Sequence, residues 1–184
     1  LSLHDALPIS SAVRTAPPST PVKSNFLSTA ATPSLVLGSL RIGDTYTLPP
    51  LEVLRQSEPS ALKRVSNFVV GQKGFGQIRF LAPVDLTGID LDRLFDGIVQ
   101  FGEGEAVLYA DPECAPKAEA GEGLNVPAEI RIERVWAHPN ARPGSEISPD
   151  RVRAITDKLR AQPGTHFVDY DAGNGVWTFT VDHF

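Results

Sequence analysis

A histidine near the end of the sequence sits in a pattern that can support chemistry. Trp177, Phe179, Val181 and His183 fall at every second position, so they share one face of an expected strand. On an apolar strand face, a histidine is by default a packed core residue. A histidine can also act as general base for a Ser, Cys or Thr nucleophile that follows closely in the chain. The pattern alone leaves both interpretations open.

Other residue types that carry chemistry are scattered. Glu122 stands out because it lies between two glycines in the segment Gly121–Asn125, although an ordinary turn explains the same pattern. His138 lies in a proline-rich loop and His166 on an expected strand, and their spacing matches no metal-ligand pattern. We therefore expect no metal ion and no cofactor.

Two further motifs argue against common activities. Gly71, Gly74 and Gly76 are spaced differently from a dinucleotide-binding fingerprint, and no Gly-Lys-Ser/Thr follows for a nucleoside triphosphate. A tight turn between two strands is the expected structure.

Cys114 is the only cysteine, which excludes an internal disulfide and a zinc site of several cysteines. We expect a reducing compartment, the nucleus or the cytosol.

The composition indicates one globular domain with a tail. The chain is 41% hydrophobic and 21% charged over 184 residues, as is usual for a folded protein. Its net charge of -5 argues against binding nucleic acid through the phosphates. No apolar run approaches the roughly 20 residues of a membrane helix, and the N-terminus does not resemble a signal peptide. We expect neither direct nucleic-acid binding nor membrane insertion.

The first part of the chain differs in character from the rest. Residues 1–9 are similar to one reading frame of a sequencing adapter, so we exclude them, and His4 with them, as a library artefact. Residues 10–34 are mostly Ser, Thr, Pro and Ala, a composition that cannot bury enough apolar surface to fold. They predict a disordered linker. A single folded domain is expected over residues 35–184.

Hydrophobic periodicity within that domain predicts short strands and few helices. Ser148-Pro149-Asp150 is a strong helix start, and Asn174-Gly175 is a strong hairpin turn. The fold class is α+β, a mostly antiparallel sheet with two or three short flanking helices. Strands are expected near 46–48, 67–70, 77–81, 98–101, 105–109, 128–132, 166–170 and 176–183, and helices near 51–55, 89–95 and 149–162.

Five motifs in a fixed order resemble a known family. They are Asn67–Phe80, Pro83–Thr87 with Leu91-Asp92, Gly121–Asn125, Trp136, and Gly175-x-Trp-x-Phe-x-Val-x-His-Phe184. This order resembles the autoproteolytic C-terminal domain of nucleoporin 98, the nucleoporin autopeptidase family. The resemblance covers roughly residues 38–184.

The resemblance implies a single-turnover, serine-type peptidase that cleaves its own chain after Phe184. In the family a Ser follows His-Phe, attacks the Phe carbonyl in an N-to-O acyl shift, and leaves an ester for water to hydrolyse. Phe184 then supplies the scissile carbonyl and His183 is the general base. Lys117 and Asn125 fall where family members also have Lys and Asn, and the resemblance makes them candidates for orienting the site or stabilising the oxyanion. Because the nucleophile lies outside the given sequence, the chain as given is expected to be inactive.

The resemblance also implies a place and partners. We expect a structural nucleoporin of the nuclear pore complex, in the nucleus, that supports transport of protein and mRNA. Its expected partners are scaffold nucleoporins: the N-terminal segment of nucleoporin 96 and the β-propeller of nucleoporin 88 or its fungal counterpart. Two alternatives stay open. One is a peptide-docking module that never cleaves, and the other is a generic α+β enzyme that uses Glu122 and His166.

Overall fold

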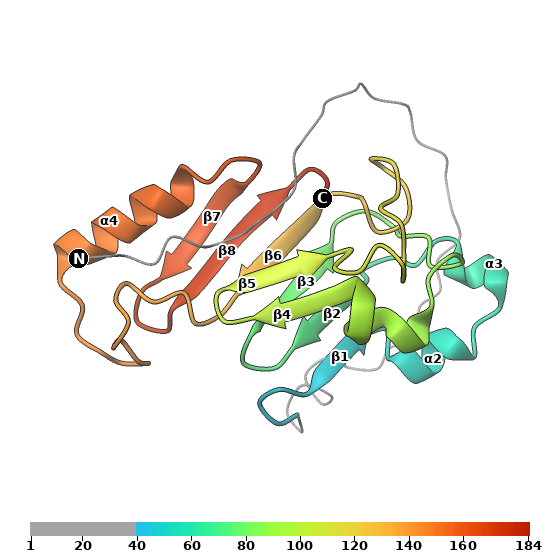
Figure 1. The fold of residues 1–184 in the computed structure, drawn as a ribbon, viewed down its shortest axis with the longest axis horizontal. Coiled ribbons are helices and arrows are strands. Elements are labelled where there is room, and N and C mark those ends of the chain that lie inside the picture. The colour runs from blue at the N-terminus through green and yellow to red at the C-terminus, as the bar shows by residue number, and fades with distance from the viewer. Residues whose placement is uncertain (1–39) are drawn as a thin grey trace.

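The computed structural model describes residues 40–184. The expectations for residues 1–9, for the linker at 10–34 and for the first residues of the domain at 35–39 lie outside this range. Within it, the chain forms an antiparallel sheet flanked by short helices (Figure 1). The predicted fold class, a mostly antiparallel α+β domain, is confirmed.

Within residues 40–184, eight strands form two sheets. The larger sheet has six strands in the order β1-β2-β3-β6-β8-β7, every neighbouring pair antiparallel, and β4 and β5 form a separate hairpin. The strands are β1 (Thr45–Leu48), β2 (Val69–Gln72), β3 (Gly76–Phe80), β4 (Val99–Gly102), β5 (Glu105–Leu108), β6 (Ala128–Ile132), β7 (His166–Asp171) and β8 (Val176–Val181).

The helices are short except for one. They are α2 (Leu51–Arg55), α3 (Pro59–Leu62), a 3₁₀ turn η1 (Leu91–Arg93), a π turn η2 (Leu94–Ile98) and α4 (Pro149–Arg160). The four-residue helix α3 has no counterpart among the sequence-based expectations. Within residues 40–184, none of these helices has the length and apolar character needed to cross a membrane.

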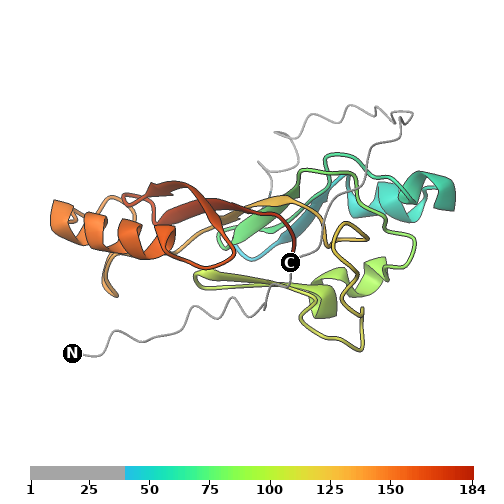
Figure 2. The ribbon, with the colours of Figure 1, turned by 90° about the horizontal axis from the view of Figure 1, so that it is seen from above.

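One face of the larger sheet builds the core. The β4–β5 hairpin and α4 lie on the same side of the sheet (Figure 2). The side chains that point to this side are buried, as Ile78, Ile130 and Phe179 illustrate on three neighbouring strands. The opposite face carries polar pairs such as Arg79 with Glu129, whose side chains are 2.9 Å apart. The sheet therefore shows the inward apolar, outward polar alternation typical of antiparallel structure.

Strand β2 begins two residues later than its hydrophobic run suggests. Asn67 adopts a left-handed conformation with a φ of 54°, which interrupts an extended chain. Phe68 is fully buried, but regular pairing begins only at Val69. The glycine-rich segment is a turn between β2 and β3, as expected.

The turn end of the β7–β8 hairpin is hydrogen-bonded to the loop after β6. Val135 donates its N–H to the Gly175 carbonyl at 2.8 Å, and the Tyr170 hydroxyl donates to the Val135 carbonyl at 2.8 Å. Burial raises the pKa of Tyr170 to about 12, with the nearby Asp171 carboxylate adding to the rise. Gly175 is required here, because an added Cβ would lie 2.6 Å from the Trp136 ring.

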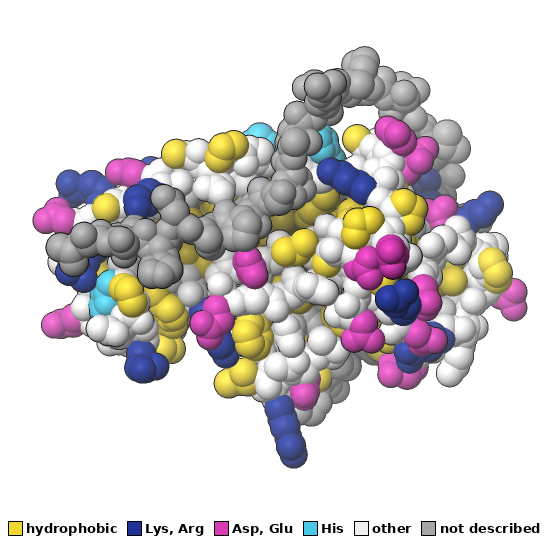
Figure 3. Space-filling model, viewed as in Figure 1, with side chains coloured by type: hydrophobic (Ala, Val, Ile, Leu, Met, Phe, Trp, Pro, Cys, Tyr) yellow, Lys and Arg dark blue, Asp and Glu magenta, His cyan; other side chains and the backbone are white. Residues whose placement is uncertain are grey.

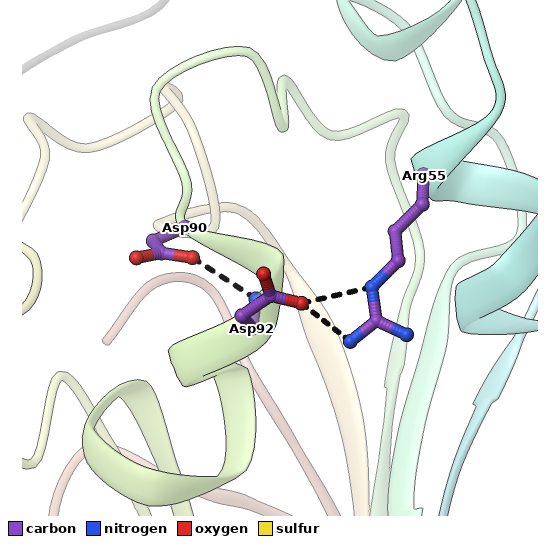
Figure 4. Close-up of polar contacts among 3 residues, drawn as sticks. All are labelled: Arg55, Asp90 and Asp92. Atoms are coloured by element: carbon purple, nitrogen blue, oxygen red, sulfur yellow. Dashed lines mark hydrogen bonds and ion pairs between the residues drawn. The ribbon is translucent and has the colours of Figure 1, made fainter.

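A surface ion pair joins α2 to η1. Arg55 donates from Nε and Nη2 to Oδ1 of Asp92, at 2.9 and 2.5 Å (Figure 4). Asp90 accepts from the Asp92 N–H at 3.0 Å and so caps η1. Because both partners are exposed, this pair contributes at most about 1 kcal/mol.

Strand β8 depends on Trp177, which is fully buried and stacks on Phe179 with ring centroids 4.0 Å apart. We predict that Trp177→Ala lowers the free energy of unfolding by about 3–5 kcal/mol, measured by urea denaturation, because it leaves a large cavity. Val168→Ala, on an edge strand and 52% exposed, is the control and should change stability by under about 0.5 kcal/mol. A loss below about 1 kcal/mol for Trp177→Ala would contradict the core assignment.

Candidate functional site

The last residues of the chain leave the sheet before the expected strand is complete. The register of β8 against β6 ends at the Ala128–Val181 pair, and its register against β7 ends at His166–Thr180. Residues 182–184 therefore have no ladder partner, and side chains hold them instead. His183 lies past the strand, half-exposed, and not on the apolar strand face that the alternation suggested.

Asn125 contacts the backbone of the final residue. Its Oδ1 accepts a hydrogen bond from the Phe184 N–H at 2.6 Å, and its Nδ2 donates to the Ala118 carbonyl at 2.8 Å. The side-chain amide can face only one way, since a backbone N–H can only donate and a carbonyl can only accept. Asn125 is 3% exposed, so these bonds form away from competing water.

The segment Gly121–Asn125 is the turn that presents this side chain. Asn125 donates its N–H to the Glu122 carbonyl at 2.8 Å, and its own carbonyl accepts from the Gly121 N–H at 2.7 Å. The flanking side chains Leu124 and Val126 are buried in the core. The turn therefore has a fixed position relative to the sheet, beside the marked C-terminal end of the chain (Figure 1).

The Phe184 side chain adds a second anchor. It is partly buried against the core, with its ring centroid 6.1 Å from that of Phe80. Phe80 in turn stacks on Phe68 at 5.6 Å. Both the backbone and the side chain of the terminal residue are thus held by groups that belong to the folded domain.

His183 faces a shallow pocket of about 130 Å³. Gly164, Thr165, His166 and Asp182 form the rest of its lining. Across this pocket, Nε2 of His166 lies 3.1 Å from Oδ2 of Asp182. Among the described residues, no hydrogen bond or ion pair engages the His183 side chain itself, so its imidazole is available for other contacts.

The remaining sequence candidates are not assembled with this group. The Lys117 and Glu122 side chains are exposed, and within residues 40–184 neither makes a side-chain hydrogen bond or ion pair. No contact in that range joins Glu122 to His166, so nothing in the geometry favours the generic enzyme. In the same range, no cluster of three or more His, Cys, Asp or Glu side chains suits a metal ion.

Cys114 is occupied by a structural contact. Its Sγ donates to Oδ2 of Asp111 at 3.0 Å, and this hydrogen bond, with burial, raises the pKa of the thiol. The thiol is thereby kept in its less nucleophilic form.

Sequence reasoning missed two features of this site. It gave no role to Asp182 or to the Ala118 carbonyl, both of which contact residues that it had singled out. The hairpin turn after Asp171 signals that residues near 166 and 181 lie opposite each other. The exact partner of His166 depends on a bulge in β7 between Phe167 and Asp169.

The chain is similar to nuclear pore proteins over nearly all of its described part. The family model described as Nup98-96 autopeptidase S59 matches residues 43–184. The Nucleoporin NUP145 of Chaetomium thermophilum is 37% identical over 142 residues, which cover 77% of this chain and 8% of that protein. The chain therefore corresponds to a small part of its curated relative.

Solved structures agree with the fold. A crystal structure of the Chaetomium thermophilum Nup145N domain, a mutant fused to Nup145C, matches with a TM-score of 0.68 and 37% identity over 77% of this chain and 95% of that one. A chain of the yeast heterotrimeric Nup82-Nup159-Nup116 nucleoporin complex matches with a TM-score of 0.64 and 31% identity, over 78% of this chain and 98% of that one.

The Asn125 contacts generate a stability prediction. Asn125→Ala leaves the Phe184 N–H and the Ala118 carbonyl without their buried partner, so we expect the free energy of unfolding to fall by about 1–3 kcal/mol in urea denaturation. Asn140→Ala, at an exposed loop position, is the matched control and should have little effect. Equal stability of the two variants would show that the Asn125 bonds do not hold the chain end.

Proposed function

Because this chain belongs to the nucleoporin autopeptidase family of nuclear pore complex proteins, we propose that its domain cleaves its own precursor after Phe184 and then docks to the pore scaffold. The observation that carries the proposal is the buried hydrogen bond from the Phe184 N–H to Asn125 Oδ1 at 2.6 Å. When a folded domain holds the residue on one side of a peptide bond, the position of that bond is also defined.

The proposed reaction needs a hydroxyl on the residue that comes after Phe184 in the precursor, a serine by family resemblance. His183 takes the hydroxyl proton as the oxygen attacks the Phe184 carbonyl carbon. The C–N bond then breaks as the nitrogen gains a proton, and the acyl group has moved from nitrogen to oxygen. Water hydrolyses the resulting ester, which leaves a carboxylate on Phe184 and a free amine and hydroxyl on the serine.

Positioning supplies part of the rate. Nucleophile and carbonyl are neighbours in one chain, so little entropy is lost in bringing them together. We assign Asn125 an orienting role, since its Nδ2 already donates to the Ala118 carbonyl and its Oδ1 cannot donate to an oxyanion. Lys117 keeps the candidate role of oxyanion stabiliser by family resemblance alone, because no contact between residues 40 and 184 joins its exposed side chain to Phe184.

Self-cleavage is tested in a precursor extended by serine and a short reporter segment. We predict that the extended chain splits during expression, and that His183→Ala slows the splitting about 100- to 10,000-fold, as loss of a general base does. The rate is measured by gel and mass spectrometry after refolding. His138→Ala, a loop histidine whose Nδ1 accepts from the Asn140 N–H, is the matched control.

Two outcomes contradict this mechanism. An intact unmutated precursor would remove self-cleavage and leave the alternative, a domain that only docks. A His183→Ala precursor that splits as fast as the unmutated one would remove His183 as the base.

Docking is the second part of the proposal. The related Nup116 chain is a component of a complex with Nup82 and Nup159. We propose that this chain likewise binds scaffold nucleoporins, the N-terminal segment of nucleoporin 96 and the β-propeller of nucleoporin 88 or its fungal counterpart, and so supports transport through the pore. Acidic and basic side chains are interspersed on the face seen in Figure 3, which suits a protein partner better than a polyanion.

The docking proposal predicts direct binding. The chain, immobilised, should retain the purified β-propeller or the purified nucleoporin 96 segment, with affinities measured by biolayer interferometry. The destabilised variant Trp177→Ala, heated to unfold it, is the control for non-specific capture. No binding of either purified partner at about 100 μM, where even weak transient complexes are populated, would overturn docking to these partners.

A further inference from the structure

The residues around His183 are held at two points on opposite sides. On one side the Phe184 N–H donates to Asn125 at 2.6 Å, and on the other Asp182 contacts His166 at 3.1 Å. His183 lies between the two anchored residues. Since residues 182–184 have no partner in the strand ladder, these contacts and the Phe184 ring are what restrict the chain end.

The second anchor exists because of the β7–β8 register. His166 is opposite Thr180, so Asp182 follows its partner by two residues and lies one residue past the end of β8. Side chains at this diagonal offset are within reach of each other. A register shift between Phe167 and Asp169 sets this alignment. The strand pairing therefore brings His166 close to Asp182.

We propose that His166 and Asp182 are positioning residues for self-cleavage, a second tether that fixes the backbone on the near side of His183. The inference rests on the proposed function. Without the His166 contact, Asp182 and His183 are held only through Phe184, by its N–H and its ring. With both anchors in place, the backbone is restrained before and after His183, which limits the positions that its imidazole can take.

The solvent exposure of the two side chains determines how much their loss should slow cleavage. The His166 and Asp182 side chains are 63% and 78% exposed, and exposed pairs of this kind couple weakly. We expect loss of either partner to slow cleavage about two- to five-fold, the factor that corresponds to such a coupling. Global stability should barely change, because neither side chain belongs to the core.

The decisive experiment is a double-mutant cycle in the serine-extended precursor. His166→Ala and Asp182→Ala should each slow cleavage by this factor, and the double variant should be no slower than the slower single variant. His166→Gln, whose amide can donate to Asp182, should restore most of the rate. Arg79→Ala, which breaks an exposed cross-strand pair with Glu129 elsewhere on the sheet, is the matched control and should leave the rate unchanged.

A second measurement does not depend on cleavage. In the chain that ends at Phe184, hydrogen exchange of the His183 and Phe184 amides should be faster in His166→Ala and Asp182→Ala, with an unchanged unfolding midpoint. Unchanged exchange in both variants overturns the tether, whether or not the precursor cleaves. Faster exchange beside an intact unmutated precursor overturns the proposed function but supports the tether. If the effects of the two substitutions on the cleavage rate are additive, His166 and Asp182 act independently, and the proposal that they act as a pair is overturned.

Discussion

The buried amide of Asn125 is the interaction on which the site depends. It satisfies a carbonyl on a surface loop and the N–H of Phe184, three residues past the end of β8, at the same time. A buried polar group without a partner costs more than the bond itself gains, so loop and strand end are stable only together. The loop keeps its shape because Leu124 and Val126 are buried on either side of this amide. The position of Phe184 therefore depends on the core that fixes this loop.

The core is built around β8, the strand that leads into the site. Strand β8 lies between β6 and β7, and its inward side chains Trp177, Phe179 and Val181 are all buried. Backbone pairing on both sides holds β8 up to its last residue, and then stops on both sides almost at once. This change from backbone pairing to side-chain anchoring is what lets the final residues adopt a conformation set by the site.

Local patterns predicted much of this architecture. The alternation in β8, the helix start at Pro149 and the hairpin turn before Gly175 are all in place, because each depends on neighbouring residues. The end of β8 was not predictable in the same way, since its pairing stops opposite the first residues of β6 and β7, Ala128 and His166. The β7 bulge and the left-handed Asn67 likewise depend on tertiary packing. Asn125 was found only through the family motif, because no spacing rule links it to a residue 59 positions away.

The contacts that hold Phe184 have a consequence for the state of the domain after the proposed cleavage. An ordinary protease must release its products before it can act again, and tight product binding would inhibit it. A domain that cuts itself once has no second substrate to admit. In the proposed reaction the new carboxyl end would form on Phe184, the residue that Asn125 and Phe80 already contact in this structure. Retention of the product would inhibit an enzyme that turns over many times. Here it would keep the new carboxyl end bound to the domain and so help to keep the domain folded.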